Sequence, residues 1–257
     1  MVLPSSGPSL VPVLRQTTPA SEVAYGRSHK GGGGSCVGGS TTTTTSSNWG
    51  GYAVQTCLNS PASGAVSDVK GSWVEPAVSC TPGQTAYSAF WVGIDGYSSG
   101  TVEQTGTDSD CNSGVATYYA WYEMYPKSSV NIALTIHAMD TISAEVHYQG
   151  SGNFVLTLTD VTSGQTSHIA KFLKHADRSS AEWIDEAPSG GGILPLANFG
   201  TVDFSQCSAT LNGLQGAIVD PQWQTAEITM SSSGTVKATT SSLTSQDTAF
   251  SATWVSS

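Results

Sequence analysis

The sequence contains few charged side chains: Asp, Glu, Lys and Arg make up only 11% of its 257 residues, against roughly a quarter in an average soluble domain. Basic residues are the scarcest, with nine Lys and Arg against 19 Asp and Glu, which gives a formal net charge of −10. Such an acidic surface repels phosphate backbones and anionic lipid, so we expect no nucleic-acid partner and no membrane binding. Few positive charges also leave little repulsion once the carboxylates are protonated, which indicates tolerance of acid.

Long apolar runs and closely spaced cysteines are also missing. No apolar stretch is long enough to span a bilayer, and no signal peptide is evident at the N-terminus. The five cysteines show no C-x-x-C pair for zinc or redox chemistry; they are Cys36, Cys57, Cys80, Cys111 and Cys207. We interpret them as two disulfides and one spare thiol in a secreted, extracellular protein, with Cys57–Cys80 as the preferred bridge. Scattered buried thiols are the alternative.

The chain changes character near residue 46. Residues 1–45 carry Pro, Gly and Thr runs, including GGGGS at 31–35 and STTTTTSS at 40–47. We expect this part to be a leader or propeptide remnant that ends in a flexible linker. From Ser46 onward, short segments rich in Val, Ile, Thr and aromatic residues alternate in polarity; they include VNIALTIHA (130–138), ISAEVHY (142–148), FVLTLTDV (154–161), TAEITM (225–230) and TAFSATWV (248–255).

A period of two residues predicts strands rather than helices. We therefore expect an all-β protein, with one β-sandwich domain over residues 46–257, and we expect a monomer.

Three segments are predicted to place acids beside large side chains on one strand face. The stretch SAEWIDEAP (180–188) holds three carboxylates in five residues. Because successive strand residues face opposite sides, the same-face sets are Trp91 with Asp95, Trp121 with Glu123, and Glu182 and Glu186 with Ile184. Asp185 is expected to point away from them. Acids are costly in a core, so a face holding both kinds of residue predicts a concave cleft for substrate binding and acid–base chemistry.

Five segments, in this order, resemble motifs of the glutamic peptidases (eqolisins), a family of acid endopeptidases: SNWGGYAV (47–54), FWVGIDG (90–96), VEQTG (102–106), AWYEMYP (120–126) and AEWIDE (181–186). The resemblance runs from about Ser46 to the C-terminus. It implies a lectin-like sandwich of two large antiparallel sheets with a concave substrate cleft. It also implies hydrolysis of polypeptides at low pH without a metal or cofactor.

The resemblance assigns roles to individual residues. Gln104 and Glu186 correspond to the family's catalytic pair: Glu186 would take a proton from water, and Gln104 would donate a hydrogen bond to the developing oxyanion. The resemblance and the strand faces together predict the substrate-binding residues, which are Trp49, Trp91, Asp95, Trp121, Glu123 and Glu182. Met124 stands where family members often have Trp, and Asp185 replaces an apolar residue; the latter puts the neighbouring packing in doubt.

Two other classes of function remain open from the sequence. A lectin-like sandwich could be a carbohydrate-binding module with Trp49, Trp91 and Trp121 as stacking platforms. It could also be a glycoside hydrolase that uses Glu123 and Glu186 as its carboxylate pair. Neither explains a Gln on the same face as the Glu. The five histidines show no metal-ligand spacing. His137 and His147 lie on predicted strands, and we expect surface or structural roles for these two.

Overall fold

The computed structural model describes residues 36–257, and these residues form 16 strands and no helix. The strands are β1 Thr41–Ser46, β2 Trp49–Gln55, β3 Val66–Val74, β4 Ala89–Ile94, β5 Val102–Asn112, β6 Val115–Tyr125, β7 Val130–Ile132, β8 Thr141–Gly150, β9 Asn153–Asp160, β10 Gln165–Phe172, β11 Ser180–Glu186, β12 Thr201–Leu211, β13 Leu214–Gly216, β14 Gln224–Ser232, β15 Thr235–Thr240 and β16 Phe250–Trp254. The all-β prediction is confirmed. In this part of the chain no helix is long and apolar enough to cross a membrane.

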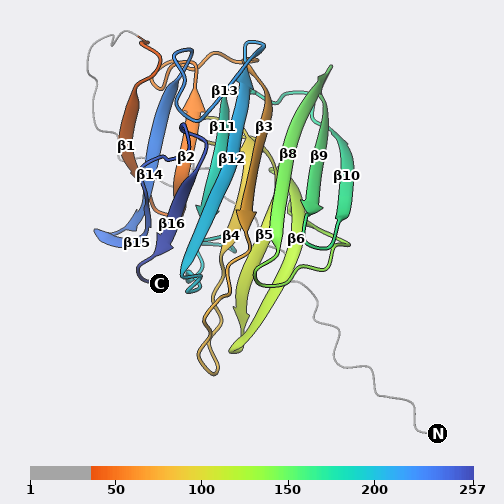
Figure 1. Ribbon diagram of the computed structural model, residues 1–257, viewed down its shortest axis with the longest axis vertical. Helices are drawn as coiled ribbons and strands as arrows, with labels where there is room; N and C mark the ends of the chain where they lie inside the picture. The colour runs from red at the N-terminus through yellow and green to blue at the C-terminus, as the bar shows by residue number, and fades with distance from the viewer. Residues whose placement is uncertain (1–35) are drawn as a thin grey trace, which may run out of the picture.

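The strands pair into one continuous sheet that folds back on itself as two layers (Figure 1). The hydrogen-bonded order is β10-β9-β8-β3-β12-β16-β15-β14-β2-β11-β4-β5-β6-β7, with β13 beside β12. The strands from β10 to β16 make the first layer, and those from β2 to β7 make the second, with β15 and β14 between them. Every pair is antiparallel except β1 with β14. The two predicted sheets are therefore the two layers of a single sheet.

The main hydrophobic core lies between the layers. Val69 and Trp73 of β3 and Phe204 of β12 belong to the same buried cluster as Val92 of β4 and Trp183 of β11. Burying a side chain of this size contributes roughly 1.5–3 kcal/mol relative to leaving it exposed. This core fixes the second layer as a rigid platform.

The second layer is buried on its outer face as well. Trp49, Trp91, Trp121 and Ile184 form a separate apolar cluster there, on β2, β4, β6 and β11. Residues next to them in sequence, such as Val92 and Trp183, face the main core instead, as alternation along a strand requires. Strands covered on both sides lose the polar alternation of a surface strand, and every residue of β2 and β11 is buried.

The predicted linker is wrong in its last part. Thr41–Ser46 form β1, which pairs in parallel with β14 from Thr41 opposite Thr225 to Ser46 opposite Met230. Threonine is β-branched and favours strands, so a Thr run can be an edge strand as well as a linker. The part of the expected leader at residues 1–35 lies outside the described residues. A second strand prediction, for 130–138, holds only over Val130–Ile132, after which the chain turns.

The prediction of two disulfides and one spare thiol is confirmed, but the pairing was wrong. The bridges are Cys36–Cys57 and Cys80–Cys111, and Cys207 is free and buried. A Cys57–Cys80 bridge would suit neighbouring strands, but β2, which ends just before Cys57, and β3, which precedes Cys80, are not neighbours. In the sheet β2 lies between β14 and β11, while β3 lies between β8 and β12.

Candidate active site

Three cross-strand rows on the outer face of the second layer hold six of the eight predicted site residues, all except Trp49 and Asp95. Each row runs across β11, β4, β5 and β6 in register. The amide row is Glu182, Gly93, Gln104 and Glu123; the tryptophan row is Ile184, Trp91, Gly106 and Trp121; the carboxylate row is Glu186, Ala89, Asp108 and Tyr119. Rows two residues apart along each strand share a face. We call this surface the dyad face, and it brings Gln104 and Glu186 to the same side of the sheet.

Glu186 is held by two nitrogen donors, Trp91 on the neighbouring strand β4 and Asn48 between β1 and β2. Trp91 Nε1 donates to its Oε2 at 2.8 Å, and Asn48 Nδ2 lies 3.3 Å from its Oε1. Asn48 is in turn fixed by Ser46, whose hydroxyl donates to Asn48 Oδ1 at 3.1 Å. Each oxygen therefore has a donor of its own, and the carboxylate is fixed in one orientation. Asn48 was not among the residues predicted from the sequence, although it lies inside the SNWGGYAV segment (47–54).

Gln104 is oriented by its neighbour in the amide row. Its Nε2 donates to Glu123 Oε2 at 2.8 Å, and both side chains are fully buried. A primary amide nitrogen carries two hydrogens, so it can donate to Glu123 and to a second acceptor at once. The arrangement fits an amide that donates to a substrate oxygen.

The second tryptophan of the tryptophan row is held in the same way as the first. Trp121 Nε1 donates to Asp108 Oδ1 at 2.6 Å, and the Tyr119 hydroxyl donates to Asp108 Oδ2 at 2.7 Å. Both indole groups thus donate to an acid of the carboxylate row. Asp108 was not among the residues predicted from the sequence, although period two from Gln104 through Gly106 leads directly to it. Asp108 is a fourth carboxyl group on the dyad face, with Glu123, Glu182 and Glu186.

Two glycines make room for the Trp91 indole. A Cβ on Gly106 would meet the Phe90 carbonyl oxygen and lie 2.6 Å from Trp91 Cβ. A Cβ on Gly93 would lie 2.8 Å from Trp91 Cζ3 and 3.1 Å from Gln104 Cβ. The indole therefore lies over Gly93, next to Gln104, while its Nε1 reaches Glu186. Trp49 packs edge-on against Trp91, with 4.9 Å between ring centroids.

Asp95 joins β4 to the segment that leads into β11. It follows the last residue of β4 and has a φ of 74°. Its carboxylate accepts hydrogen bonds from the Ser179 amide at 2.8 Å, from the Ser179 hydroxyl at 3.0 Å and from the Arg178 amide. These bonds give Asp95 a clear structural task, and its predicted contact with substrate stays a prediction.

Two further acids are buried near Asp95. Burial raises the pKa of Glu103 and of Glu182 well above the usual range, and the nearby Asp95 raises both further. Burial also raises the pKa of Asp95. Glu103 and Glu182 therefore favour the neutral form. Glu182 lies on the dyad face as predicted, whereas Glu103 faces the opposite side of β5.

Asp185 points away from the dyad face, as the alternation predicts. It lies in the interior beside Gly50, where a Cβ would lie 2.8 Å from Asp185 Oδ2, and it is fully buried. Neither of its oxygens bonds another described residue. Burial raises the pKa of Asp185 to about 7. Its neighbour along the chain, Glu186, has a hydrogen-bond donor on each oxygen. The two adjacent carboxyl groups therefore lie in different environments.

Fold and site together define an all-β sandwich protein with an amide and several carboxyl groups held on one rigid strand face. A comparison with known families matches residues 47–254 to the Peptidase A4 family. The chain belongs to this family, and the resemblance to the glutamic peptidases is confirmed.

Individual relatives and solved structures support the same family assignment. Aspergillopepsin-2 of Aspergillus niger is 33% identical over 132 residues, and the match spans 49% of this chain and only 47% of that protein. Scytalidopepsin B of Scytalidium lignicola is 32% identical over 191 residues, which is 68% of each chain. The solved structure of scytalido-glutamic peptidase with a peptide-based transition state analogue has a TM-score of 0.68 at 27% identity, covering 82% of this chain and 100% of that one. Aspergilloglutamic peptidase of Aspergillus niger has a TM-score of 0.59 at 30% identity, covering 66% and 99%.

Proposed function

We propose that this protein is an acid endopeptidase that hydrolyses peptide bonds in polypeptides with Gln104 and Glu186 as its catalytic pair. The observation that carries the proposal is their common placement. Both project from rigid strands onto the dyad face, and each is oriented by hydrogen bonds, Gln104 to Glu123 and Glu186 to Trp91 and Asn48. Membership of a peptidase family supports the reaction class.

The proposed reaction follows from the chemistry of the two groups. Ionised Glu186 takes a proton from water as the water oxygen bonds to the scissile carbonyl carbon. The carbonyl oxygen becomes an oxyanion, which accepts a hydrogen bond from Gln104 Nε2. As the C–N bond breaks, Glu186 returns the proton to the leaving amine, and a carboxylic acid and an amine are released. With a reference Glu pKa of about 4.3, a working carboxylate of this kind is suited to acid.

Glu103 and Glu182 do not compete for the role of base. Burial raises the pKa of each, so both stay protonated at the acidic pH where the reaction is proposed to run.

The substrate site is proposed to be lined by Trp49, Trp91, Trp121, Asp95, Glu123 and Glu182. Glu123 already bonds the Gln104 amide, which favours an orienting role over one in a glycosidase pair. Neither carbohydrate alternative is favoured by the similar proteins.

An assay with two substrate classes tests the proposal. The purified protein is incubated at about pH 3–4 with denatured casein and, separately, with a panel of polysaccharides. We expect cleavage of casein into peptides and no release of sugar. Sugar release or binding without casein cleavage would overturn the proposal.

We also propose that the protein is secreted and acts as a monomer. The two disulfides support an oxidising compartment.

A leader segment released from the domain would have to end before Cys36, because Cys36 is bonded to Cys57 and β1 belongs to the sheet. Intact-mass measurement of the active protein tests this: loss of a segment ending between Cys36 and Ser46 would contradict it.

A further inference from the structure

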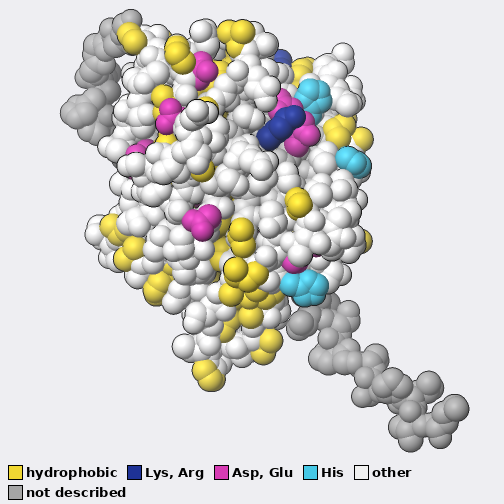
Figure 2. Space-filling view, viewed as in Figure 1, with side chains coloured by type: hydrophobic (Ala, Val, Ile, Leu, Met, Phe, Trp, Pro, Cys, Tyr) yellow, Lys and Arg dark blue, Asp and Glu magenta, His cyan; other side chains and the backbone are white. Residues whose placement is uncertain are grey.

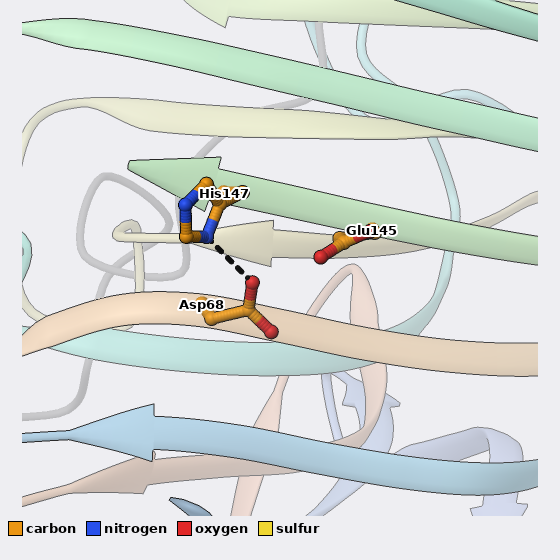
Figure 3. A group of neighbouring side chains, drawn as sticks. All are labelled: Asp68, Glu145 and His147. Atoms are coloured by element: carbon orange, nitrogen blue, oxygen red, sulfur yellow. Dashed lines mark hydrogen bonds and ion pairs between the residues drawn. The ribbon is translucent and has the colours of Figure 1, made fainter. Parts of the chain in front are cut away.

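A cluster of three potential metal ligands lies on the first layer, outside the candidate active site. Asp68 on β3 pairs in register with His147 on β8, and Lys70 pairs with Glu145 on the same two strands (Figure 3). Val69, between Asp68 and Lys70, faces the main core. By alternation, Asp68 and Lys70 therefore face outward from the first layer, whereas the dyad face is the outer side of the second layer.

The three ligand side chains converge on one point. His147 Nδ1 lies 2.8 Å from Asp68 Oδ2, and one ligand atom from each of Asp68, Glu145 and His147 lies within 4.8 Å of the other two. The Asp68 side chain is only 9% exposed, while those of Glu145 and His147 are 33% and 46% exposed. The cluster therefore has a buried anionic base and an open side toward solvent.

A cationic group already lies against this cluster. Lys70 Nζ is 2.8 Å from Glu145 Oε1 and 3.7 Å from Asp68 Oδ1. The face seen in Figure 2 shows basic atoms lying across acidic ones, with a histidine beside them. The Lys70 side chain is 44% exposed, so it can leave for solvent without breaking the core.

We propose that Asp68, Glu145 and His147 bind one divalent transition-metal ion, with Zn²⁺ as the ion best suited to them. Tetrahedral zinc accepts imidazole nitrogen and carboxylate oxygen at about 2.0–2.2 Å, which sets its ligand atoms about 3.4 Å apart. The three atoms already lie within 4.8 Å of one another, so zinc binding would draw them closer by side-chain rotation, and water would complete the coordination. Mg²⁺ and Ca²⁺ take oxygen ligands, so an imidazole in the set disfavours them.

The sequence offers no sign of this site because its ligands come from two strands far apart in the chain. Asp68 and His147 are 79 residues apart, and neither lies in a spacing typical of zinc motifs. Only the pairing of β3 with β8 brings them together. A bound ion would join these two strands, so it should stabilise the first layer and leave peptide hydrolysis on the second layer unchanged.

Isothermal titration calorimetry of the full chain with ZnCl₂ at pH 7 tests the proposal, because metal ligands must be deprotonated. We expect one Zn²⁺ per chain and no heat from MgCl₂ or CaCl₂. His147→Ala should weaken the affinity by on the order of tenfold or more. His137→Ala is the matched control, since His137 Nδ1 also faces a single carboxylate, Asp140 Oδ2 at 3.3 Å, and this variant should bind as wild type does.

Lys70→Gln keeps the proposal testable even if His147→Ala does not fold. Removing the competing ammonium should tighten Zn²⁺ binding, and Zn²⁺ should raise the Tm of this variant and of wild type. Equal binding by wild type and His147→Ala would overturn the site. So would weaker Zn²⁺ binding in Lys70→Gln than in wild type, or no binding in either.

Discussion

Trp91 Nε1 donates a hydrogen bond to Glu186 Oε2 at 2.8 Å, and the same indole lies over Gly93 beside Gln104. The tryptophan predicted as a substrate contact thus also orients the proposed catalytic base. Its position depends on the glycines of two separate segments, Gly93 of FWVGIDG and Gly106 of VEQTG. FWVGIDG (90–96) and VEQTG (102–106) therefore pack together around the Trp91 side chain.

Trp91→Phe should slow catalysis while keeping the apolar ring. The variant loses the donor to Glu186, and a hydrogen bond to a charged group is worth about 1.5–3 kcal/mol, so kcat should fall roughly 10- to 100-fold. Steady-state kinetics on a peptide substrate measures this. Trp223→Phe is the control, because Trp223 is a buried tryptophan whose Nε1 donates to Ile218 O at 3.0 Å. Equal losses of kcat in both variants would contradict a specific role for Trp91.

Gln104→Ala should reduce turnover by roughly 10²–10³, the usual effect of removing one oxyanion donor. Gln104→Glu is more informative because it sets a carboxyl group against Glu123, which now accepts from Gln104 Nε2. The two acids would titrate as a coupled pair. We expect a much lower rate and a displaced pH profile, measured as kcat/KM against pH. A profile that matches wild type in shape and height would remove Gln104 from the mechanism.

Gly106→Ala should destabilise the fold, because its methyl group would meet the Phe90 carbonyl and Trp91 Cβ. Overpacking of this kind costs about 1–3 kcal/mol. Urea denaturation should show a lower midpoint at unchanged m-value. Gly100→Ala is the control, since a Cβ there meets nothing within 4 Å. Similar midpoints for the two variants would show that the close approach at Gly106 is unimportant.

Asp185→Asn tests whether burial raises the pKa of Asp185. Because the folded pKa of Asp185 is raised to about 7, its proton stabilises the fold below the unfolded pKa of about 3.9. That stability is lost as pH rises from there to about 7. Glu75, whose pKa burial also raises to about 7, acts in the same direction. We expect equal free energies of unfolding for variant and wild type at pH 3, and a variant more stable at pH 7 by on the order of 3 kcal/mol.

Denaturant titrations at both pH values measure this difference. Parallel pH dependences of the two proteins would contradict the raised pKa of Asp185. Activity of Asp185→Asn in acid should stay near that of wild type, because Asp185 faces the interior, away from Gln104 and Glu186.

Strand alternation predicted much of the site but could not show how the strands are ordered. Within one strand, period two correctly placed Glu182 and Glu186 on one side and Asp185 on the other. Cys57–Cys80 was wrong because chain order does not determine which strands are neighbours. The segment 133–138 alternates like a strand, yet Leu134 N donates to Ile132 O and the chain turns. Asp108 and Asn48 were missed because only the paired strands show which polar groups contact a tryptophan or Glu186.

The most direct test of the proposed mechanism is the turnover of Glu186→Gln on a peptide substrate at about pH 3–4. Glutamine is nearly the same size as glutamate but cannot take a proton from water. We predict a folded protein with wild-type circular dichroism and no measurable peptide hydrolysis. Turnover close to that of wild type in this variant would contradict the assignment of Glu186 as the catalytic base.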